Sequence, residues 1–311
     1  MRRLRTDCAT PRLPARLEAS VVQDPVETKT RAATVSSVLA EAIKSLDPLV
    51  SASRLEAEIL LAHALGTSRH RLYAWPERKI GTESRDAVRA LVARRREGEP
   101  IAYITGSREF WSLELEVNRH VLIPRPETES VVEAALDLVP KDAKSQIADL
   151  GTGCGAIAAA IAAERTACRV LVTDISSRAL AVARRNFRRL GMVNARFCIA
   201  RWFEPFSRLH LDLIVCNPPY VADDDPHLLK GDLRFEPRLA LAGGADGLDA
   251  IRNVAATARD HLKAGGALVF EHGVDQGAPV RDLMAGLGYR ELVTLKDLAQ
   301  HDRVTRGRRP D

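Results

Sequence analysis

The sequence has 311 residues, with 46 Lys and Arg against 41 Asp and Glu, a formal net charge of +5, and 46% hydrophobic residues. This composition is typical of globular proteins, and at about 150 residues per domain the length predicts two domains. No apolar run approaches the ~18 residues of a membrane span. The five cysteines are scattered without a CxxC pair, which argues against a disulfide scaffold or a structural zinc site and favours a reducing compartment.

The first 30 residues contain scattered prolines and arginines but no apolar periodicity. We expect residues 1–30 to form a mobile tail. Acidic residues in this segment argue against an organelle transit peptide, and it has no apolar core for a secretory signal. We therefore expect a cytoplasmic protein.

The next segment, residues 31–100, has the spacing of apolar residues that is typical of helices. A first helix begins at Val35. Ser53 is placed to cap a second helix, which Gly66 would end. Thr82 opens a last helix. Together these elements predict a small helical bundle.

The excess of positive charge lies in the first 100 residues, whereas residues 101–311 carry equal numbers of basic and acidic side chains. Arg94, Arg95 and Arg96 form the basic end of the predicted bundle. Such a surface fits contact with a polyanion or an acidic partner, and it fits a solvated face equally well.

Residues 101–123 alternate in the manner of strands, most clearly at Leu113, Leu115 and Val117, and predict a β-hairpin between two domains. From residue 124 to residue 311 helices and strands alternate. The expected helices cover residues 129–138, 156–163, 177–190, 248–262 and 280–287, and the expected strands cover residues 146–150, 169–173, 197–199, 211–216 and 267–271. Repeated βα units predict an α/β fold with a mostly parallel sheet covered on both faces. The basic tail, Arg306 to Arg309, is expected to finish an antiparallel edge strand.

A glycine loop follows the predicted strand at residues 146–150. It consists of Gly151, Thr152, Gly153, Cys154 and Gly155. Glycines let the backbone turn tightly beside a ligand, and the helix that follows offers unpaired N–H groups. Asp174 ends the next strand, and an acid about 20 residues beyond such a loop can reach a ribose diol. Because the spacing is GxGxG and no lysine follows, the loop favours a nucleoside without a pyrophosphate, such as S-adenosylmethionine.

A proline-locked turn directly follows the apolar strand at residues 211–216. It consists of Asn217, Pro218, Pro219 and Tyr220. Two consecutive prolines fix φ near about −65° and remove two N–H donors, and the asparagine before them is restricted as well. The result is a stiff turn at the carboxyl end of a strand, where open α/β sheets bind ligands.

The residue types in this turn suit methyl transfer to a planar nitrogen. Such a nitrogen is a poor nucleophile because its lone pair is delocalised, so it must be held in line with the methyl group that it attacks. The Asn217 side-chain oxygen can accept one N–H of the substrate, and the Pro218 carbonyl can accept the other. Tyr220 can pack on the planar group and exclude water. We therefore expect catalysis by positioning and desolvation, without a dedicated base.

With these motifs the sequence resembles the release-factor glutamine methyltransferase family over about residues 31–308. Other matching segments are Glu99–Gly106, Arg108–Trp111, Leu122–Glu129, Asp225–Leu228, Arg234–Pro237 and Glu271–Gly273. The resemblance implies a Rossmann-like, S-adenosylmethionine-dependent methyltransferase domain over residues 124–311. A release-factor-recognition domain over residues 31–100 and the hairpin linker over residues 101–123 would precede it. The implied reaction methylates the N5 amide of the glutamine in the Gly-Gly-Gln motif of peptide chain release factors.

The resemblance also implies roles for individual residues. Gly151 to Gly155 would bind the methionine and ribose parts of the cofactor, and Asp174 would bind the ribose hydroxyls. The segment from Asn217 to Tyr220 would bind and orient the substrate glutamine, with Asn217 also beside the cofactor. Glu127 and Thr128 would support this site.

Adenine recognition is where the sequence departs from the family. Trp202 occupies the position that packs against adenine, but the family often has an acid just before this aromatic residue. Here that position is Arg201. Adenine binding must then depend on backbone groups or on stacking against Trp202.

Two other functions remain open at this point. An adenine-N6 methyltransferase acting on DNA or RNA would use the same hydrogen-bond pattern, but it needs a surface that reads bases. The charge-balanced second part of the chain has no large insertion for such a surface, so we expect neither sequence-specific nucleic-acid contacts nor a membrane partner. A cofactor-binding module docked on the ribosome would not need all four residues of the proline-locked turn, the tetrad from Asn217 to Tyr220. No HExxH or GxSxG pattern supports a metal site or a serine nucleophile.

Overall fold

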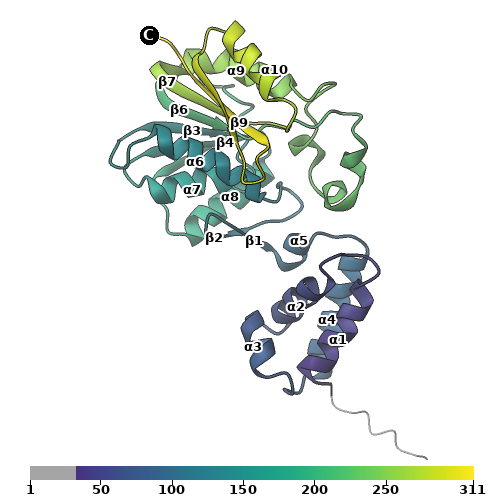
Figure 1. Ribbon diagram of the computed structural model, residues 1–311. Helices are drawn as coiled ribbons and strands as arrows, with labels where there is room; N and C mark the ends of the chain where they lie inside the picture. Colours follow the sequence, from purple (N-terminus) through teal and green to yellow (C-terminus); the bar gives the residue numbers. More distant parts are fainter. Residues whose placement is uncertain (1–32) are drawn as a thin grey trace, which may run out of the picture.

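The computed structural model describes residues 33–311, which form a helical bundle and an α/β unit (Figure 1). The expectation of a mobile tail over residues 1–30 lies outside the described residues. Within the part of the chain that the structure describes, no helix has the length and apolar character needed to cross a membrane.

The bundle consists of α1 (Val35–Leu46), α2 (Ser53–Ala64), α3 (Arg69–Ala74) and α4 (Thr82–Arg96). Its apolar residues form one core, in which Leu46, Leu60 and Leu61 are fully buried. The helix starts and stops agree with expectation except at Ser53. Its hydroxyl donates to Asp47 Oδ1 at 2.5 Å, because α2 begins with Ser53 itself and the capping position falls to Ala52.

The segment between the bundle and the sheet begins with a helix, α5 (Ile101–Thr105), and only then forms the hairpin of β1 (Ser107–Phe110) and β2 (Leu113–Glu116). The expected hairpin over residues 101–123 was therefore too long. Three consecutive residues of α5 are buried, from Ala102 to Ile104, and a strand would turn the middle one outward. The Tyr103 hydroxyl donates to the Val121 carbonyl at 2.6 Å, which joins α5 to the chain after the hairpin.

Seven strands form the main sheet, in the order β5-β4-β3-β6-β7-β9-β8. They are β3 (Gln146–Leu150), β4 (Arg169–Asp174), β5 (Ala195–Ile199), β6 (Leu211–Cys216), β7 (Leu262–Glu271), β8 (Arg290–Lys296) and β9 (Asp302–Arg308). The first five strands in this order pair in parallel, whereas β9 is antiparallel to both β7 and β8. The predicted mostly parallel α/β sheet is confirmed.

The far edge of the sheet differs from expectation. The C-terminal strand β9 lies between β7 and β8, so it is not the edge strand, and β8 was not foreseen. None of the residues of β8 is fully buried, so its sequence lacks the apolar run by which the inner strands were found.

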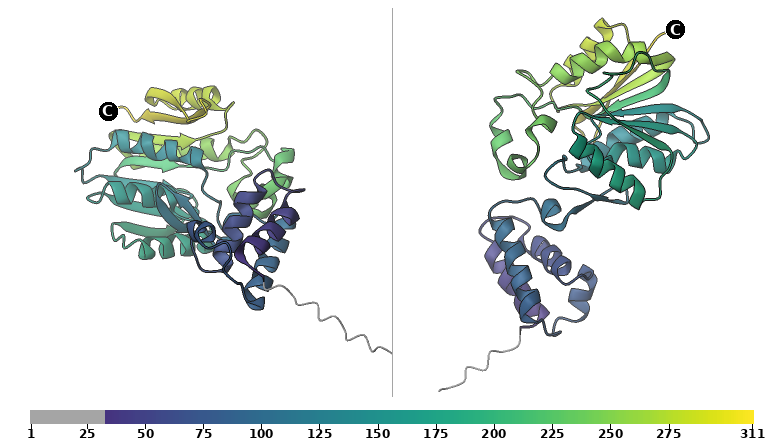
Figure 2. Two further views of the ribbon diagram at one scale, coloured as in Figure 1. Left: turned by 60° about the horizontal axis from the view of Figure 1, so that its bottom comes forward. Right: turned by 180° about the vertical axis from the view of Figure 1, so that it is seen from behind.

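Helices cover both faces of the sheet (Figure 2). One face packs against α6 (Glu129–Leu138), α7 (Ala156–Glu164) and α8 (Ser177–Arg189), and the other against α9 (Asp249–His261) and α10 (Gly277–Gly286). Each face of the sheet has its own apolar core, and alternate residues of one strand pack in different cores, as Leu213 and Ile214 of β6 do. Four short 3₁₀ helices lie in the loops: η1 (Pro126–Thr128), η2 (Pro226–Leu229), η3 (Gly231–Phe235) and η4 (Arg238–Ala240).

The loop that carries η2 to η4 extends from the sheet toward the bundle (Figure 1). Arg95 of α4 reaches Asp232 of η3 at 3.2 Å and also binds Glu56 at 2.8 Å. Arg234 hydrogen-bonds to the Glu97 carbonyl. Arg95, expected on a solvated or partner-binding face, is instead part of a joint within the molecule.

Candidate active site

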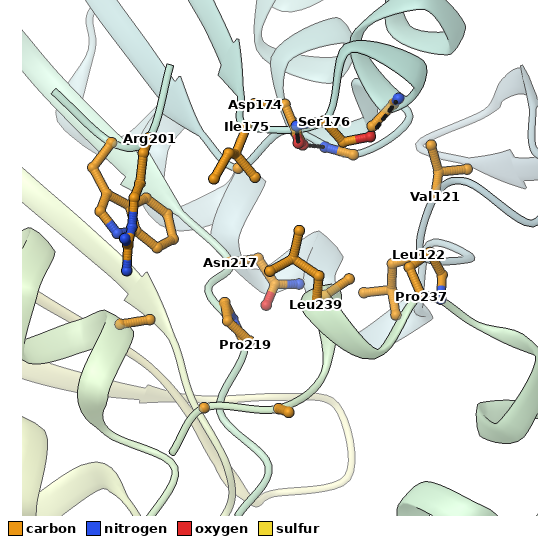
Figure 3. Close-up of a pocket in the computed structure, with 18 of the residues that line it drawn as sticks. Val121, Leu122, Asp174, Ile175, Ser176, Arg201, Asn217, Pro219, Pro237 and Leu239 are labelled. Carbon is orange, nitrogen blue, oxygen red and sulfur yellow. Dashed lines mark hydrogen bonds between the residues drawn. The ribbon is translucent and has the colours of Figure 1, made fainter. Parts of the chain in front are cut away.

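A cavity of about 710 Å³ opens at the carboxyl ends of the central strands. The strand order reverses at β3, which pairs with β4 on one side and β6 on the other, and this is where open α/β sheets bind ligands. Figure 3 shows Asp174 across the cavity from Asn217, with Arg201 toward one end and Leu122 and Pro237 toward the other.

The glycine loop turns from β3 into α7 at one wall of the cavity. Gly151, Gly153 and Gly155 all have positive φ, at 70°, 58° and 87°, a conformation that side chains disfavour. A Cβ on Gly155 would lie 3.1 Å from the Ala183 Cβ, whereas a Cβ on Gly153 would meet no atom within 4 Å. Gly155 is therefore needed for packing of α7 on α8, and Gly153 leaves space on the ligand side.

A buried acid that the sequence analysis missed holds this loop from behind. Asp149, 1% exposed, accepts a hydrogen bond from the Thr152 hydroxyl at 2.6 Å and another from the Ala158 N–H at 3.2 Å. Burial raises the pKa of Asp149 to about 7, although these two hydrogen bonds lower it. The signal was a single acid in an otherwise apolar strand, directly before the glycines.

Asp174 ends β4 and lines the cavity. Its two carboxylate oxygens accept hydrogen bonds from the Gly153 N–H at 2.9 Å and the Ser176 N–H at 2.8 Å. Burial raises the pKa of Asp174, against the effect of these hydrogen bonds. Each carboxylate oxygen can accept more than one hydrogen bond, so Asp174 can still bind hydroxyl groups in the cavity.

Trp202 and Arg201 close one end of the cavity. The Trp202 ring lies over the glycine loop, 3.4 Å from the position of a Cβ on Gly151. Trp202 itself has a φ of 52°, an uncommon conformation for a large side chain. The arrangement offers an aromatic face beside the loop.

The proline-locked turn forms the opposite wall. Asn217 and Pro219 line the cavity, whereas Pro218 is buried behind them. The Asn217 Nδ2 donates to the Thr128 Oγ1 at 3.4 Å. This long hydrogen bond leaves the Asn217 side-chain oxygen as the end of the amide that can accept an N–H.

Tyr220 points its hydroxyl away from solvent and donates to Glu271 Oε1 at 3.0 Å. Burial is the main cause that raises the pKa of Tyr220, and the Glu271 carboxylate adds to it. Glu271 ends β7 and is 1% exposed. Its contact with the tetrad was not anticipated, because Glu271 lies in another strand.

The structure separates the predicted site residues into two groups. Those that line the cavity are Gly151, Gly153, Asp174, Trp202, Asn217 and Pro219. Those that lie behind its walls are Thr128, Thr152, Cys154, Gly155, Pro218 and Tyr220. Glu127 is exposed and does not line the cavity. The cavity is also lined by residues to which the sequence analysis gave no role in the site, among them Val121, Leu122, Ile175, Pro237 and Leu239.

Metal binding finds no support in the geometry. Among residues 33–311, no three His, Cys, Asp or Glu side chains gather in a way that could hold a metal ion. The cavity instead suits a nucleoside with a short polar tail. It offers open space beside Gly153, free lone pairs on Asp174 and the aromatic face of Trp202.

A mostly parallel sheet with a GxGxG loop and an acid on adjoining strands defines the class of the protein, which is an S-adenosylmethionine-dependent methyltransferase. Two family models match the chain: "PrmC N-terminal domain" over residues 37–106 and "Methyltransferase small domain" over residues 131–230. The chain belongs to the release factor glutamine methyltransferase family.

Relatives of that description match most of the chain. The protein of Xylella fastidiosa is 48% identical over 83% of this chain and 94% of its own, and that of Vibrio cholerae is 45% identical over 88% and 96%. Among solved structures, a methyltransferase from Pyrococcus furiosus has a TM-score of 0.50 with 19% identity, over 70% of this chain and 98% of its own. That structure shows the fold, whereas the Xylella and Vibrio relatives favour the release-factor function over an adenine-N6 methyltransferase.

Proposed function

We propose that the protein methylates the side-chain amide nitrogen of the glutamine in the Gly-Gly-Gln motif of peptide chain release factors. The observation that carries this proposal is the position of Asn217. Its amide faces the same cavity as Asp174, and its nitrogen is engaged by Thr128. The free oxygen can therefore accept an N–H of a substrate amide.

One wall of the cavity would bind the cofactor, and the other would bind the substrate. Gly151, Gly153 and Asp174 would hold the cofactor, which supplies an activated methyl group on a sulfonium. Trp202 would stack on its adenine, since Arg201 cannot accept a hydrogen bond from an adenine amine. Thr152, Cys154 and Gly155 would act from behind the wall, as supports of the loop.

The proline-locked turn would hold the substrate glutamine. Asn217 Oδ1 would accept one amide N–H and the Pro218 carbonyl the other, so that the lone pair of the nitrogen is aimed at the methyl group. The two prolines fix this geometry before the substrate arrives, which avoids an entropic cost during the reaction. The proton that leaves the nitrogen would pass to water, without a dedicated base. Glu127, exposed in η1, would support the bound substrate.

The division into a recognition domain over residues 31–100, a linker over residues 101–123 and a catalytic domain over residues 124–311 is part of this proposal. The basic surplus of the first 100 residues, of which two charges fall within residues 33–100, supports contact of this part of the chain with an acidic face of the release factor, and also supports association with the ribosome. The four cysteines within residues 33–311 are free thiols, which supports a cytoplasmic location.

The proposal is tested by offering radiolabelled S-adenosylmethionine with one of three substrates: purified release factor, the same factor with Gln→Ala in its Gly-Gly-Gln motif, and DNA. We expect label only on the unmodified factor. Label on DNA, or equal label on both forms of the factor, would contradict the proposal.

A further inference from the structure

Glu271 is a buried acid that forms no ion pair with any residue from 33 to 311. It ends β7 and is 1% exposed. Its Oε1 accepts the hydrogen bond from the Tyr220 hydroxyl, and its Oε2 has no hydrogen-bond partner among the described residues. A buried polar group without full pairing costs folding free energy. Such a cost calls for a reason in the function of the site.

The charged groups around Glu271 do not neutralise it. The nearby Arg303 binds Asp297 at 3.3 Å and the His272 carbonyl at 3.3 Å, so its guanidinium is engaged elsewhere. Burial raises the pKa of Glu271, whereas the Thr128 and Tyr220 hydroxyls and the charge of Arg303 lower it. Among the described residues the carboxyl accepts one hydrogen bond, from the Tyr220 hydroxyl, and the Thr128 hydroxyl lies near it.

These two hydroxyls lead to both ends of the proline-locked turn. Tyr220 is its last residue. Thr128 accepts the hydrogen bond from Asn217, its first residue, at 3.4 Å. Glu271 is thus bonded to the last residue of the turn and lies near the partner of its first residue, so that it can act on both ends. At 3.4 Å the Asn217 bond is weak, and without support the amide could rotate and present its nitrogen to the cavity.

We propose that Glu271 is a positioning residue, which holds Tyr220 and Thr128 so that Asn217 presents its side-chain oxygen to the substrate amide. This inference rests on the proposed function. Glu271 touches neither substrate nor cofactor, since it does not line the cavity. Its loss should lower the rate of methyl transfer and leave cofactor affinity intact.

The test compares Glu271→Leu with Glu271→Gln. Leucine removes the acceptor for the Tyr220 hydroxyl, and we expect kcat at saturating release factor to fall on the order of tenfold. Glutamine keeps an acceptor oxygen in the same place and should restore most of the rate. The dissociation constant for S-adenosylmethionine, measured by calorimetry, should not change in either variant.

A matched control is available in the bundle. Glu58 is also 1% exposed and accepts a hydrogen bond from a tyrosine hydroxyl, that of Tyr73. Glu58→Leu should lower the melting temperature but not kcat. If a fall in kcat merely followed lost stability, this variant would show it too.

A double-mutant cycle with Tyr220→Phe completes the test. If Glu271→Leu does not fold, Tyr220→Phe alone tests the inference, because it removes the same hydrogen bond from the other side. We expect Tyr220→Phe to lower kcat in the wild-type background, and Glu271→Leu to add little to it. Full additivity, or equal rates for Glu271→Leu and the wild type, would overturn the inference alone. Failure of the wild type to label release factor would instead overturn the proposed function.

Discussion

The α/β unit buries some of its acids in a way that the bundle does not. In the bundle, Glu58 is paired with Arg54 and Arg69. Burial acts to raise its pKa, but hydrogen bonds from Tyr73 and these arginines lower it overall. In the α/β unit, the buried acids Glu236 and Asp297 are likewise paired, with Arg125 and Arg303. Three other buried acids, Asp149, Asp174 and Glu271, form no ion pair among the described residues, and the pKa of each is raised.

This difference separates residues that hold the fold together from residues that prepare a site. The unpaired acids of the α/β unit lie at or next to the carboxyl ends of β3, β4 and β7, where they surround the cavity. Paired acids such as Glu58 stabilise one packing arrangement. Unpaired buried acids cost stability, and they gather where ligands bind.

The largest effect is expected from Asn217→Ala. The variant loses the acceptor for the substrate amide, and kcat should fall by about a hundredfold or more because the nitrogen is no longer oriented. Affinity for S-adenosylmethionine should stay within a few-fold, as binding calorimetry would show. Asn194→Ala, far from the cavity, serves as the matched control with normal turnover. An unchanged rate in Asn217→Ala would refute the role of this residue.

Asp174→Asn tests the cofactor wall. The amide replaces a charged acceptor that faces the cavity, and the loss of charge-assisted hydrogen bonds should weaken S-adenosylmethionine binding about 10- to 100-fold. Equilibrium binding measures this directly. Glu133→Gln, an exposed acid on α6, should bind the cofactor normally. If both variants bind alike, Asp174 does not hold the ribose.

Asp149 should make stability depend on pH. Its pKa is raised from 3.8 to about 7 in the folded protein, so the folded state retains a proton that the unfolded state releases. The contribution of Asp149 to the free energy of unfolding is full below about pH 4 and is lost as the pH rises to about 7. Between pH 5 and pH 7 the free energy of unfolding should fall by about 2 kcal/mol from this group. Urea unfolding of Asp149→Asn should show a flatter profile, and an identical slope would exclude the effect.

The joint between the two regions should give the smallest effect. Arg95→Ala removes contacts to Glu56 and Asp232, and we expect KM for release factor to rise several-fold, with an effect of about 1 kcal/mol. The neighbouring Arg96 is exposed and provides the matched control, Arg96→Ala. Steady-state kinetics with intact release factor compares the two. If both variants raise KM equally, the basic end acts through its charge and not through the joint.

The sequence predicted the inner strands and the turns that follow them well. Apolar runs such as 211–216 are buried on both faces of the sheet, and glycines or prolines end them, so the periodic signal is strong. The strand β8 was missed because its residues are half-exposed. The helix α5 was missed because alternating residues next to Pro100 look the same in a short helix and a strand.

The cavity itself was only half predictable. Local motifs predict the residues that lie at or directly after the end of a strand, such as Asp174 and Asn217. The contacts of Asn217 with Thr128, and of Tyr220 with Glu271, join segments that are far apart in the sequence, and no local pattern indicates them. They arise from the strand order β3-β6-β7 and from η1, which places Thr128 beside the tetrad.

The loop with η3 and η4 has a consequence for any attempt to shorten the protein. Glu236 in this loop accepts a hydrogen bond from the Ile123 N–H at 3.1 Å and pairs with Arg125, while Asp232 is held by α4. Pro237 and Leu239 of the same loop form part of the cavity wall. A fragment without the bundle would thus lose contacts that hold a loop of its own active centre in place.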